Sequence, residues 1–198
     1  MRSSRWTPVA TRAPSDDEAQ EPSLIEAARG GDARAFEDLL RRHEARVFRV
    51  LRLLGVPASD RDDVAQNVFL RIFRGLDGFR AGRPFSSWVY KIAANAALDW
   101  RGQSDRQRRE EAPWDDALDE AATPAGTGAL DLARRLEAAL DTLSERERAV
   151  FVLVEIEGIE RADAARALGI TGITVRRHLG LAKVRLRLAL SEKKPDSR

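Results

Sequence analysis

The chain has 198 residues, of which 43% are hydrophobic and 33% charged, with a formal net charge of +2 and no cysteine. The lack of cysteine excludes disulfides, thiolate metal sites and cysteine nucleophiles, and suits a cytoplasmic protein. No apolar run approaches the roughly 18 residues that span a membrane, and no apolar segment follows Arg2 and Arg5 to form a secretory signal. We therefore expect a globular chain without direct membrane insertion.

The chain begins with a polar segment, residues 1–21, which we predict to be a disordered tail. Ser23 and Glu26 have the spacing of a capping box, so a short helix is expected to start there and to stop near Gly30. Asp32 has the chemistry of an N-cap for the helix that follows.

Three longer helices are predicted in the first half by apolar residues that recur at three- and four-residue spacing. The first runs from Asp32 to Gly55 and the second from Asp60 to Gly75. The third is capped by Ser86 or Ser87 and continues to about Trp100. The apolar stripes contain Phe36, Leu39, Leu40, Val47, Val50, Leu51 and Leu54, then Val64, Val68, Phe69, Ile72 and Phe73, then Val89, Ile92, Ala93 and Ala96. We expect one compact helical domain over residues 22–103.

A flexible acidic linker is predicted over residues 104–129. Pro113 and Pro124 interrupt any helix, and every charged residue from Glu110 to Asp131 is acidic, so the chain repels itself and extends. A second helical domain is expected over residues 130–190, followed by a tail over 191–198. Two domains on such a linker are expected to move independently in solution. No segment alternates with period two long enough to be a strand, so the fold class is all-α.

Residues Arg161 to Leu181 have the pattern of a helix-turn-helix. This motif needs a small residue where its helices cross, a turn residue that tolerates positive φ, and a branched apolar residue on the second helix. Ala165, Gly169 and Val175 stand at that spacing. The alternative is an ordinary helical hairpin with a solvated basic face. The absence of acids from Gly172 to Ser191 favours a DNA-reading helix.

Two groups of segments together resemble an extracytoplasmic-function (ECF) sigma factor of the sigma-70 family. The first group contains Asp62-Asp63-Val64-Ala65-Gln66-Asn67-Val68-Phe69-Leu70-Arg71-Ile72-Phe73-Arg74, then Phe79-Arg80, Phe85-Ser86-Ser87-Trp88-Val89-Tyr90-Lys91-Ile92-Ala93-Ala94-Asn95 and Ala97-Leu98-Asp99. The second runs from Leu143 to Leu186, and the resemblance covers about residues 23–190. It implies a protein that binds bacterial RNA polymerase core, opens a minus-ten element with its first domain and reads a minus-thirty-five element as duplex with its second. No cofactor is implied, and the family commonly has an anti-sigma protein as partner.

The resemblance also implies three sets of site residues. The core polymerase-binding set is Asp62, Asp63, Gln66, Asn67, Leu70 and Arg74. The set for minus-ten DNA is Arg80, Phe85, Trp88, Lys91, Asn95, Asp99 and Arg101. The set for minus-thirty-five DNA is Thr171, Ile173, Thr174, Arg176, Arg177, His178, Gly180, Lys183 and Arg187. Two alternatives stay open from the residues alone: Asp62 and Asp63 could be acids favoured by a helix dipole, and Phe85 and Trp88 could be plain core.

The sequence departs from the family pattern at three places. Asn67 stands where an acid is common, and Glu160-Arg161 replaces a hydroxyl residue followed by an aromatic one. Gly180-Leu181 stands where a polar or basic pair is usual, so an upstream promoter preference does not carry over. Gly180 either lets DNA approach the backbone closely or reflects drift. The acidic linker could mimic RNA in the polymerase or serve as a plain spacer.

The main rival is a helix-turn-helix transcriptional regulator that acts without core polymerase, which would need a ligand, phosphorylation or dimer domain. The first half shows no receiver pattern or sensor pocket. An enzyme is disfavoured because His43 and His178 are far apart in sequence and no Gly-Lys-Ser/Thr phosphate loop occurs. Stable binding to core polymerase separates a sigma factor from the other classes.

Overall fold

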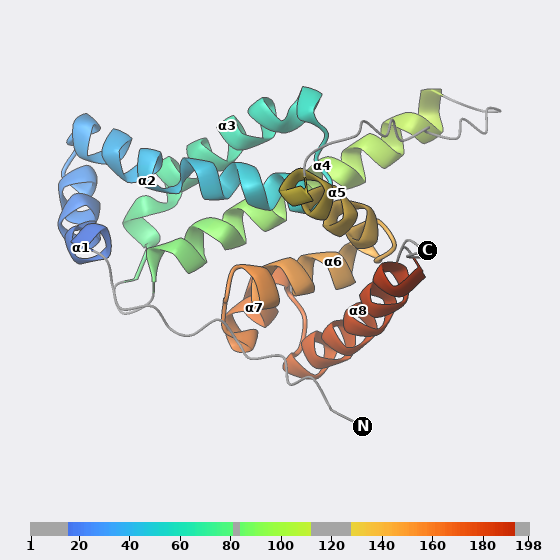
Figure 1. Ribbon diagram of the computed structural model, residues 1–198. Helices are drawn as coiled ribbons and strands as arrows, with labels where there is room; N and C mark the ends of the chain where they lie inside the picture. The colour runs from blue at the N-terminus through green and yellow to red at the C-terminus, as the bar shows by residue number, and fades with distance from the viewer. Residues whose placement is uncertain (1–15, 81–83, 112–127, 193–198) are drawn as a thin grey trace.

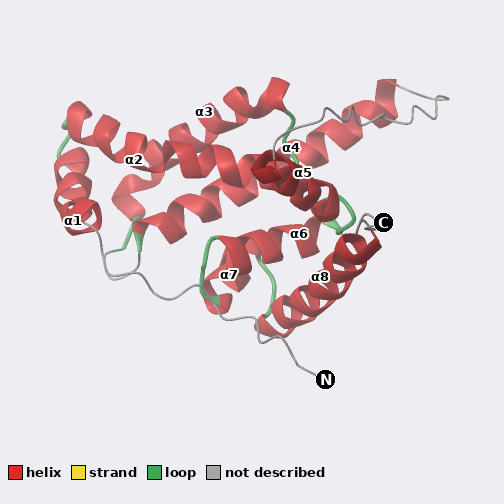
Figure 2. Ribbon diagram, in the orientation of Figure 1, coloured by secondary structure: helices red, strands yellow, loops and turns green. Residues whose placement is uncertain are grey.

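The computed structural model describes residues 16–80, 84–111 and 128–192, and all regular structure within these ranges is helical (Figures 1 and 2). The elements are α1 (Asp16–Arg29), α2 (Ala33–Leu53), α3 (Ala58–Gly75), the 3-10 helix η1 (Leu76–Gly78), α4 (Phe85–Glu111), α5 (Gly128–Leu140), α6 (Glu145–Phe151), the π-helix η2 (Val152–Ile156), α7 (Arg161–Leu168) and α8 (Gly172–Glu192). The all-α expectation is confirmed. None of the described helices is both long enough and apolar enough to cross a bilayer.

The first region, α1 to α4, is built on three mutually packed helices, α2, α3 and α4. Their apolar stripes meet in a core that contains Leu39, Val68 and Val89, each fully buried. Asp32 caps α2 as predicted, because its Oδ1 accepts hydrogen bonds from the backbone N–H groups of Arg34 and Ala35 at 2.9 and 3.2 Å.

In the second region, α5 to α8, the residues that cap the N-terminus of α6 also contact α8. Ser144 and Glu147 form the predicted capping box. The carboxylate of Glu147 is buried and also accepts from Arg185 of α8 at 2.7 Å, so the cap ties α6 to the long last helix. Because this buried carboxylate accepts hydrogen bonds from Ser144 and Arg185, it is not left without a partner in the core.

The helix-turn-helix consists of α7 and α8. Gly169 ends α7 with φ +62°, in the left-handed region that favours glycine. Ala165 of α7 and Val175 of α8 are both buried. The left-handed turn predicted at Gly169 is confirmed.

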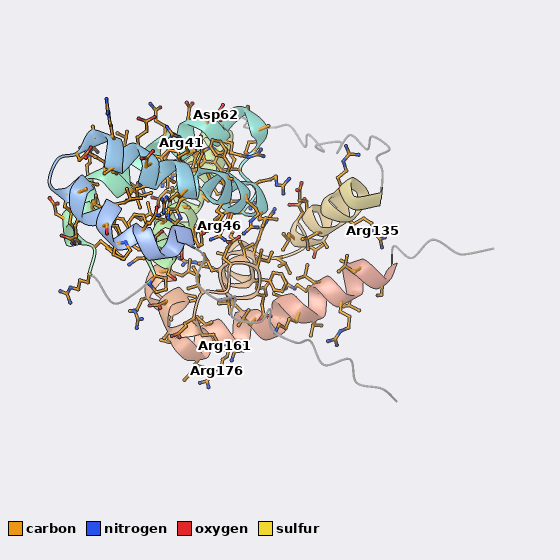
Figure 3. The ribbon with its side chains drawn as sticks, turned by 60° about the vertical axis from the view of Figure 1, so that its left-hand side comes forward. Arg41, Arg46, Asp62, Arg135, Arg161 and Arg176 are labelled. Atoms are coloured by element: carbon orange, nitrogen blue, oxygen red, sulfur yellow. The ribbon has the colours of Figure 1, made fainter. Side chains whose placement is uncertain are left out.

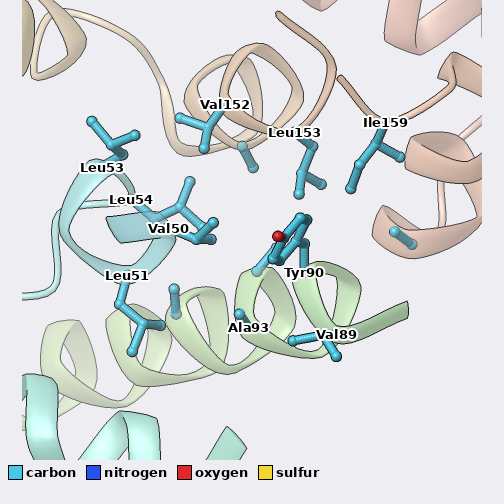
Figure 4. Packing of buried hydrophobic residues seen from close by; sticks show 14 of the residues in the cluster. Val50, Leu51, Leu53, Leu54, Val89, Tyr90, Ala93, Val152, Leu153 and Ile159 are labelled. Carbon is cyan, nitrogen blue, oxygen red and sulfur yellow. The ribbon is translucent and has the colours of Figure 1, made fainter. Parts of the chain in front are cut away.

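The two regions pack against each other, which differs from the independent motion that the linker composition predicts. Figure 4 shows Val50 and Leu53 of α2 and Tyr90 of α4 facing Val152 and Leu153 of η2. All five side chains are buried. Only Val50 among these five residues lies on a predicted apolar stripe, and such a stripe marks residues that need burial but not which partner supplies it.

Polar contacts close the same interface at its edges. Arg49 donates to the carboxylate of Glu157 with Nε at 3.1 Å and Nη2 at 2.8 Å. Arg52 pairs with Glu137 at 3.3 Å. The interface therefore combines an apolar centre with ion pairs around it.

Two boundaries differ from the sequence expectation. Helix α1 begins at Asp16, inside the predicted tail, because the carboxylate of Glu21 reaches the buried His43 of α2 at 2.7 Å and holds the segment there. Helix α4 begins at Phe85, one residue before the predicted caps, and continues to Glu111, beyond both the predicted helix end at about Trp100 and the predicted domain boundary at residue 103. Residues 104–111 are rich in Arg, Gln and Glu, which favour helix. The rest of the predicted linker, 112–127, and residues 1–15 lie outside the described residues.

Candidate functional site

A polar stripe runs along the exposed side of α3, and it holds all the residues expected to bind core polymerase. Asp62, Asp63, Gln66, Asn67, Leu70 and Arg74 are all exposed. Val64, Val68 and Ile72 on the opposite side are buried in the first region. We call these six residues, together with Phe73, the α3 stripe.

Phe73 was predicted to lie on the buried apolar stripe of this helix, and that prediction is wrong. Its side chain is 63% exposed and its ring packs edge-on against Phe36 at 5.1 Å. At 100° per residue Phe73 lies about 180° from Val64 around α3, so the helical wheel carries this signal. The apolar pair Leu70 and Phe73 is thus flanked by acids and amides.

A cavity of about 330 Å³ lies where the loop after η1 meets α4 and α7. It is lined by Gly78, Phe79, Arg80, Pro84, Ser87, Trp88, Lys91, Asp163 and Arg166. We call it the loop pocket. It brings together three of the residues expected to contact minus-ten DNA, namely Arg80, Trp88 and Lys91. An aromatic wall beside two cations suits a nucleobase and its phosphate.

Phe85 supports this pocket from beneath rather than lining it. It is 1% exposed, and its ring contacts Phe79 at 5.1 Å, Trp88 at 5.4 Å and His43 at 5.3 Å. The core alternative therefore holds for Phe85, whereas Trp88 is only partly buried and reaches the cavity.

The remaining residues of the minus-ten set do not share one environment. At 100° per residue, Lys91, Asn95 and Asp99 follow one face of α4 that includes Trp88, and Arg101 lies on another. Asp99 pairs with Arg71 of α3 at 2.8 Å. Arg101 faces the junction of the two regions instead: its Nη1 donates to the carbonyl of Leu54, at the end of α2, at 3.2 Å, and its Nε lies 3.4 Å from Glu145 of α6.

The exposed face of α8 carries most of the residues expected to read duplex DNA. Ile173 is 72% exposed, and Arg176, Arg177, Gly180 and Arg187 are exposed on the same side. We call this surface the α8 face. It also exposes Leu181, Val184 and Leu188 further along the helix.

The four remaining residues of that set, Thr171, Thr174, His178 and Lys183, differ in their contacts. Thr171 caps α8, since its Oγ1 accepts from the backbone N–H of Thr174 at 3.2 Å and lies 2.8 Å from that residue's hydroxyl. Lys183 pairs with Glu155 of η2 at 2.9 Å. His178 is half-buried, and its Nδ1 has no hydrogen-bond partner among the described residues.

The α3 stripe and the α8 face have opposite chemical character and lie far apart. Figure 3 shows Asp62 and Arg176 at opposite sides of the molecule. The described part of the chain contains no group of three or more side chains suited to hold a metal ion. The described residues thus form an acidic stripe with an apolar centre on α3, an aromatic and basic pocket, and a basic face on α8.

Comparison with known proteins accounts for both regions. Residues 39–107 match the model of Sigma-70 region 2, and residues 133–186 match that of Sigma-70, region 4. The ECF RNA polymerase sigma factor SigM of Mycobacterium tuberculosis is 34% identical over 170 residues, which is 85% of this chain and 84% of that protein. The RNA polymerase sigma factor CnrH of Cupriavidus metallidurans is 32% identical over 173 residues, 82% of this chain and 90% of that protein.

Solved structures agree with the fold. The structure of CnrH in complex with the cytosolic domain of CnrY has a TM-score of 0.64 and 28% identity, covering 88% of this chain and 99% of that one. The sigma factor RpoE of Bartonella quintana, solved with the anti-sigma factor NepR, has a TM-score of 0.65 and 23% identity, covering 80% and 98%. The chain belongs to the extracytoplasmic-function sigma factors of the sigma-70 family.

Proposed function

We propose that this protein binds the core of bacterial RNA polymerase and directs it to promoters, where it opens the minus-ten element and reads the minus-thirty-five element as duplex. The observation that carries the proposal is the presence, in one chain, of an exposed acidic stripe on α3 and an exposed basic face on α8, within the two regions that define the family. The polymerase performs the chemistry, and the protein acts in the cytoplasm.

The α3 stripe is the surface for core polymerase. Acids and amides surround the apolar pair Leu70 and Phe73, which is 47% and 63% exposed. Interfaces gain most of their affinity from such a buried centre once the partner covers it, while the surrounding charges steer the encounter. The partner surface is therefore expected to be basic at its rim and apolar in its middle.

The loop pocket is the site for a melted base of the minus-ten strand. Trp88 and Phe79 offer aromatic surface for stacking, and Arg80 and Lys91 offer cations for phosphates. Asn95 extends the same face of α4 with an amide that can hydrogen-bond a base edge. Arg101 reaches this strand only after its contacts with Leu54 and Glu145 are released.

The α8 face enters the major groove of the upstream element. Arg176, Arg177 and Arg187 supply contacts to phosphates and base edges, and Ile173 can pack against a thymine methyl group. Helix-turn-helix regulators share this feature. The rival function without core polymerase leaves region 2 and the α3 stripe unexplained, so it is not favoured.

A protein that blocks these surfaces is the expected regulator. CnrH was solved with the cytosolic domain of CnrY, and RpoE with the anti-sigma factor NepR. By analogy this chain has an anti-sigma partner. The acidic and apolar α3 stripe is one surface that such a partner would have to cover.

Size-exclusion co-elution with RNA polymerase core tests the proposal. Asp62→Asn with Asp63→Asn is expected to weaken co-elution, because the change removes two exposed charges without changing side-chain size. A matched control is Glu26→Gln with Glu44→Gln, two exposed acids on α1 and α2. If the wild-type protein does not co-elute while a control sigma factor binds normally, the alternative function is favoured, a helix-turn-helix regulator that acts without core polymerase.

Leu70→Ala examines the apolar centre of the stripe. The substitution is expected to weaken core binding about tenfold, because the side chain of Leu70 would be fully buried only against the polymerase, like the anchor residue of an interface. Its effect on the free energy of unfolding should stay near 0.5 kcal/mol, since Leu70 is exposed in the free protein.

A further inference from the structure

The loop pocket contains an acid that a site for single-stranded DNA does not need. Its aromatic and basic sides come from the first region, whereas α7 of the second region adds Asp163 and Arg166. A carboxylate repels the phosphates of a DNA strand. Beside cations and an aromatic wall, it is suited instead to accept hydrogen bonds from a ligand. The acid therefore points to a ligand that carries both an anionic group and hydrogen-bond donors.

The aromatic side of the pocket is held in place by its neighbours. Gly75 of α3 allows the Trp88 ring to lie close, since a Cβ at Gly75 would stand 3.2 Å from Cζ2 of that ring. The ring centroids of Phe79 and Phe85 are both 5.4 Å from that of Trp88. A ring fixed in this way loses little conformational freedom when a flat ligand stacks on it. Trp88 is thus a preformed surface for an aromatic base.

The basic side of the pocket suits a terminal phosphate. Arg80 and Lys91 form no ion pair with an acid within residues 16–80, 84–111 and 128–192, so an anion can bind them without breaking an existing pair. A phosphate monoester carries about −1.5 to −2 charges at pH 7, whereas each phosphate within a DNA strand carries about one. Two such cations therefore match the 5′-phosphate of a mononucleotide better than the interior of a strand.

The acid selects among bases by the donors on their Watson–Crick edges. Asp163 is 21% exposed and pairs with Arg166 of the next turn, which restrains its carboxylate. An ionised carboxylate only accepts hydrogen bonds, and it can accept several at once. Guanine offers two adjacent donors, N1–H and the 2-amino group, whereas adenine and cytosine present a ring nitrogen that is itself an acceptor. Hydrogen bonds to a carboxylate are about twice as strong as neutral ones, so guanine is the base that this acid favours.

We propose that the loop pocket is a binding site for a free guanine 5′-mononucleotide. The base stacks on Trp88 and donates from N1–H and the 2-amino group to Asp163. The 5′-phosphate binds Arg80 and Lys91. The cavity of about 330 Å³ is at the lower end of the range of about 300–1,000 Å³ for small-molecule sites, which fits one mononucleotide.

The nucleotide and a melted base of the minus-ten strand use the same side chains. Both stack on Trp88 and both place a phosphate on Arg80 and Lys91, so each excludes the other from the pocket. Only the free nucleotide needs Asp163 in addition. This mutual exclusion rests on the proposed function of the loop pocket, whereas the nucleotide site itself does not.

Calorimetric titration of the full-length protein with three mononucleotides tests the base contact. Inosine 5′-monophosphate (IMP) differs from guanosine 5′-monophosphate (GMP) only in lacking the 2-amino group. Adenosine 5′-monophosphate (AMP) presents an acceptor where GMP presents N1–H. We expect IMP to bind about tenfold more weakly than GMP, because one hydrogen bond to a charged group is lost. AMP should bind more weakly than IMP.

Two variants separate recognition of the base from binding of the phosphate. Asp163→Asn keeps the size of the side chain, and it should reduce the preference for GMP over IMP from about tenfold to about twofold, because a neutral amide accepts weaker hydrogen bonds. Lys91→Gln should weaken GMP and IMP alike, about tenfold, and leave their ratio unchanged. The control is Asp38→Asn, which changes an acid in the same i,i+3 spacing to Arg41 on α2 and should bind as the wild type does.

Fluorescence anisotropy follows the competition with DNA. The probe is a labelled degenerate single-stranded DNA of about 12 nucleotides, within the usual site size of such proteins. GMP is expected to displace this strand from the wild-type protein at concentrations where IMP leaves it bound.

Equal affinity of the wild-type protein for GMP and IMP, or binding of neither, would overturn the proposal, and this comparison does not depend on whether a variant folds. A folded Asp163→Asn variant that keeps the full preference for GMP would overturn it as well. If Lys91→Gln weakens binding of the single strand while GMP does not bind at all, only the nucleotide site fails. If GMP binds with the expected preference but leaves the strand bound, the nucleotide site stands and the minus-ten role of the pocket fails.

Discussion

The guanidinium of Arg148 in α6 donates from Nε to the carbonyl oxygen of Leu53, the last residue of α2, at 2.5 Å. The same guanidinium contacts Asp141 at 2.5 Å, and its side chain is only 4% exposed. Burial lowers the pKa of Arg148, and the carboxylate of Asp141 opposes that effect. A buried cation from the second region thus caps the end of a helix in the first.

Replacing this arginine should loosen the joint between the regions. Arg148→Met is expected to lower the free energy of unfolding by about 2–3 kcal/mol, because the carbonyl of Leu53 loses a buried donor. Urea unfolding of the full chain measures the change. Arg41→Met, in an exposed pair with Glu37 and Asp38, is the control and should stay within about 0.5 kcal/mol. Equal effects of the two substitutions would contradict the structural role of Arg148.

Tyr90 reports on the same interface through its pKa. Burial raises the pKa of Tyr90 above its usual value of 10.0, and the hydrogen bond from Arg46, 3.1 Å from its hydroxyl, opposes the rise. Because the folded value is the higher one, the contribution of Tyr90 to stability is complete below pH 10 and is lost as the pH rises through the folded pKa.

Alkaline titration should show this directly, since Tyr90 is the only tyrosine of the chain. Tyrosinate absorbance of the native protein is expected to rise at higher pH than that of the urea-unfolded chain. Tyr90→Phe should make the loss of stability above pH 10 less steep. A native titration that coincides with the unfolded one would show that Tyr90 is not buried.

The sequence pattern predicted most of the local structure, because local structure depends on neighbouring residues. The cap at Asp32, the capping box at Ser144 and the left-handed turn at Gly169 each follow from a short motif whose chemistry acts within a few residues. The exposure of Asp62 and the other stripe residues follows from the 3.6-residue period in the same way.

Contacts between distant segments account for what the pattern could not predict. Helix α1 extends into a polar segment because the carboxylate of Glu21 contacts the ring of His43, which follows 22 residues later in the sequence. Arg101 faces the junction of the two regions because Leu54, at the end of α2, and Glu145 of α6 meet there, and nothing in the sequence around Arg101 indicates it. The loop pocket combines Lys91 with Asp163, and only the docking of the two regions brings that pair to one cavity.

Arg176 should contribute to duplex binding through phosphates or base edges, and salt dependence distinguishes the two. Each phosphate contact adds about 0.9 to the slope of log affinity against log salt. If Arg176 contacts a phosphate, Arg176→Ala should weaken binding and reduce the slope by about 1. Arg34→Ala, an exposed cation at the start of α2, is the matched control and should leave the slope unchanged. An unchanged slope with reduced sequence preference would instead indicate a base contact.

Gly180 is the position where the α8 face departs from its family, and the structure gives its backbone no internal reason to be glycine. A Cβ at this residue would meet nothing within 4 Å. Gly180→Ala is therefore expected to raise the free energy of unfolding by about 1 kcal/mol, the difference in helix propensity. Thermal unfolding measures this change, and duplex anisotropy is recorded on the same sample. A more stable variant with unchanged duplex affinity would assign the glycine to drift. A more stable variant with weaker duplex binding would show that the DNA backbone approaches α8 too closely for a methyl group, since the protein itself leaves room for one.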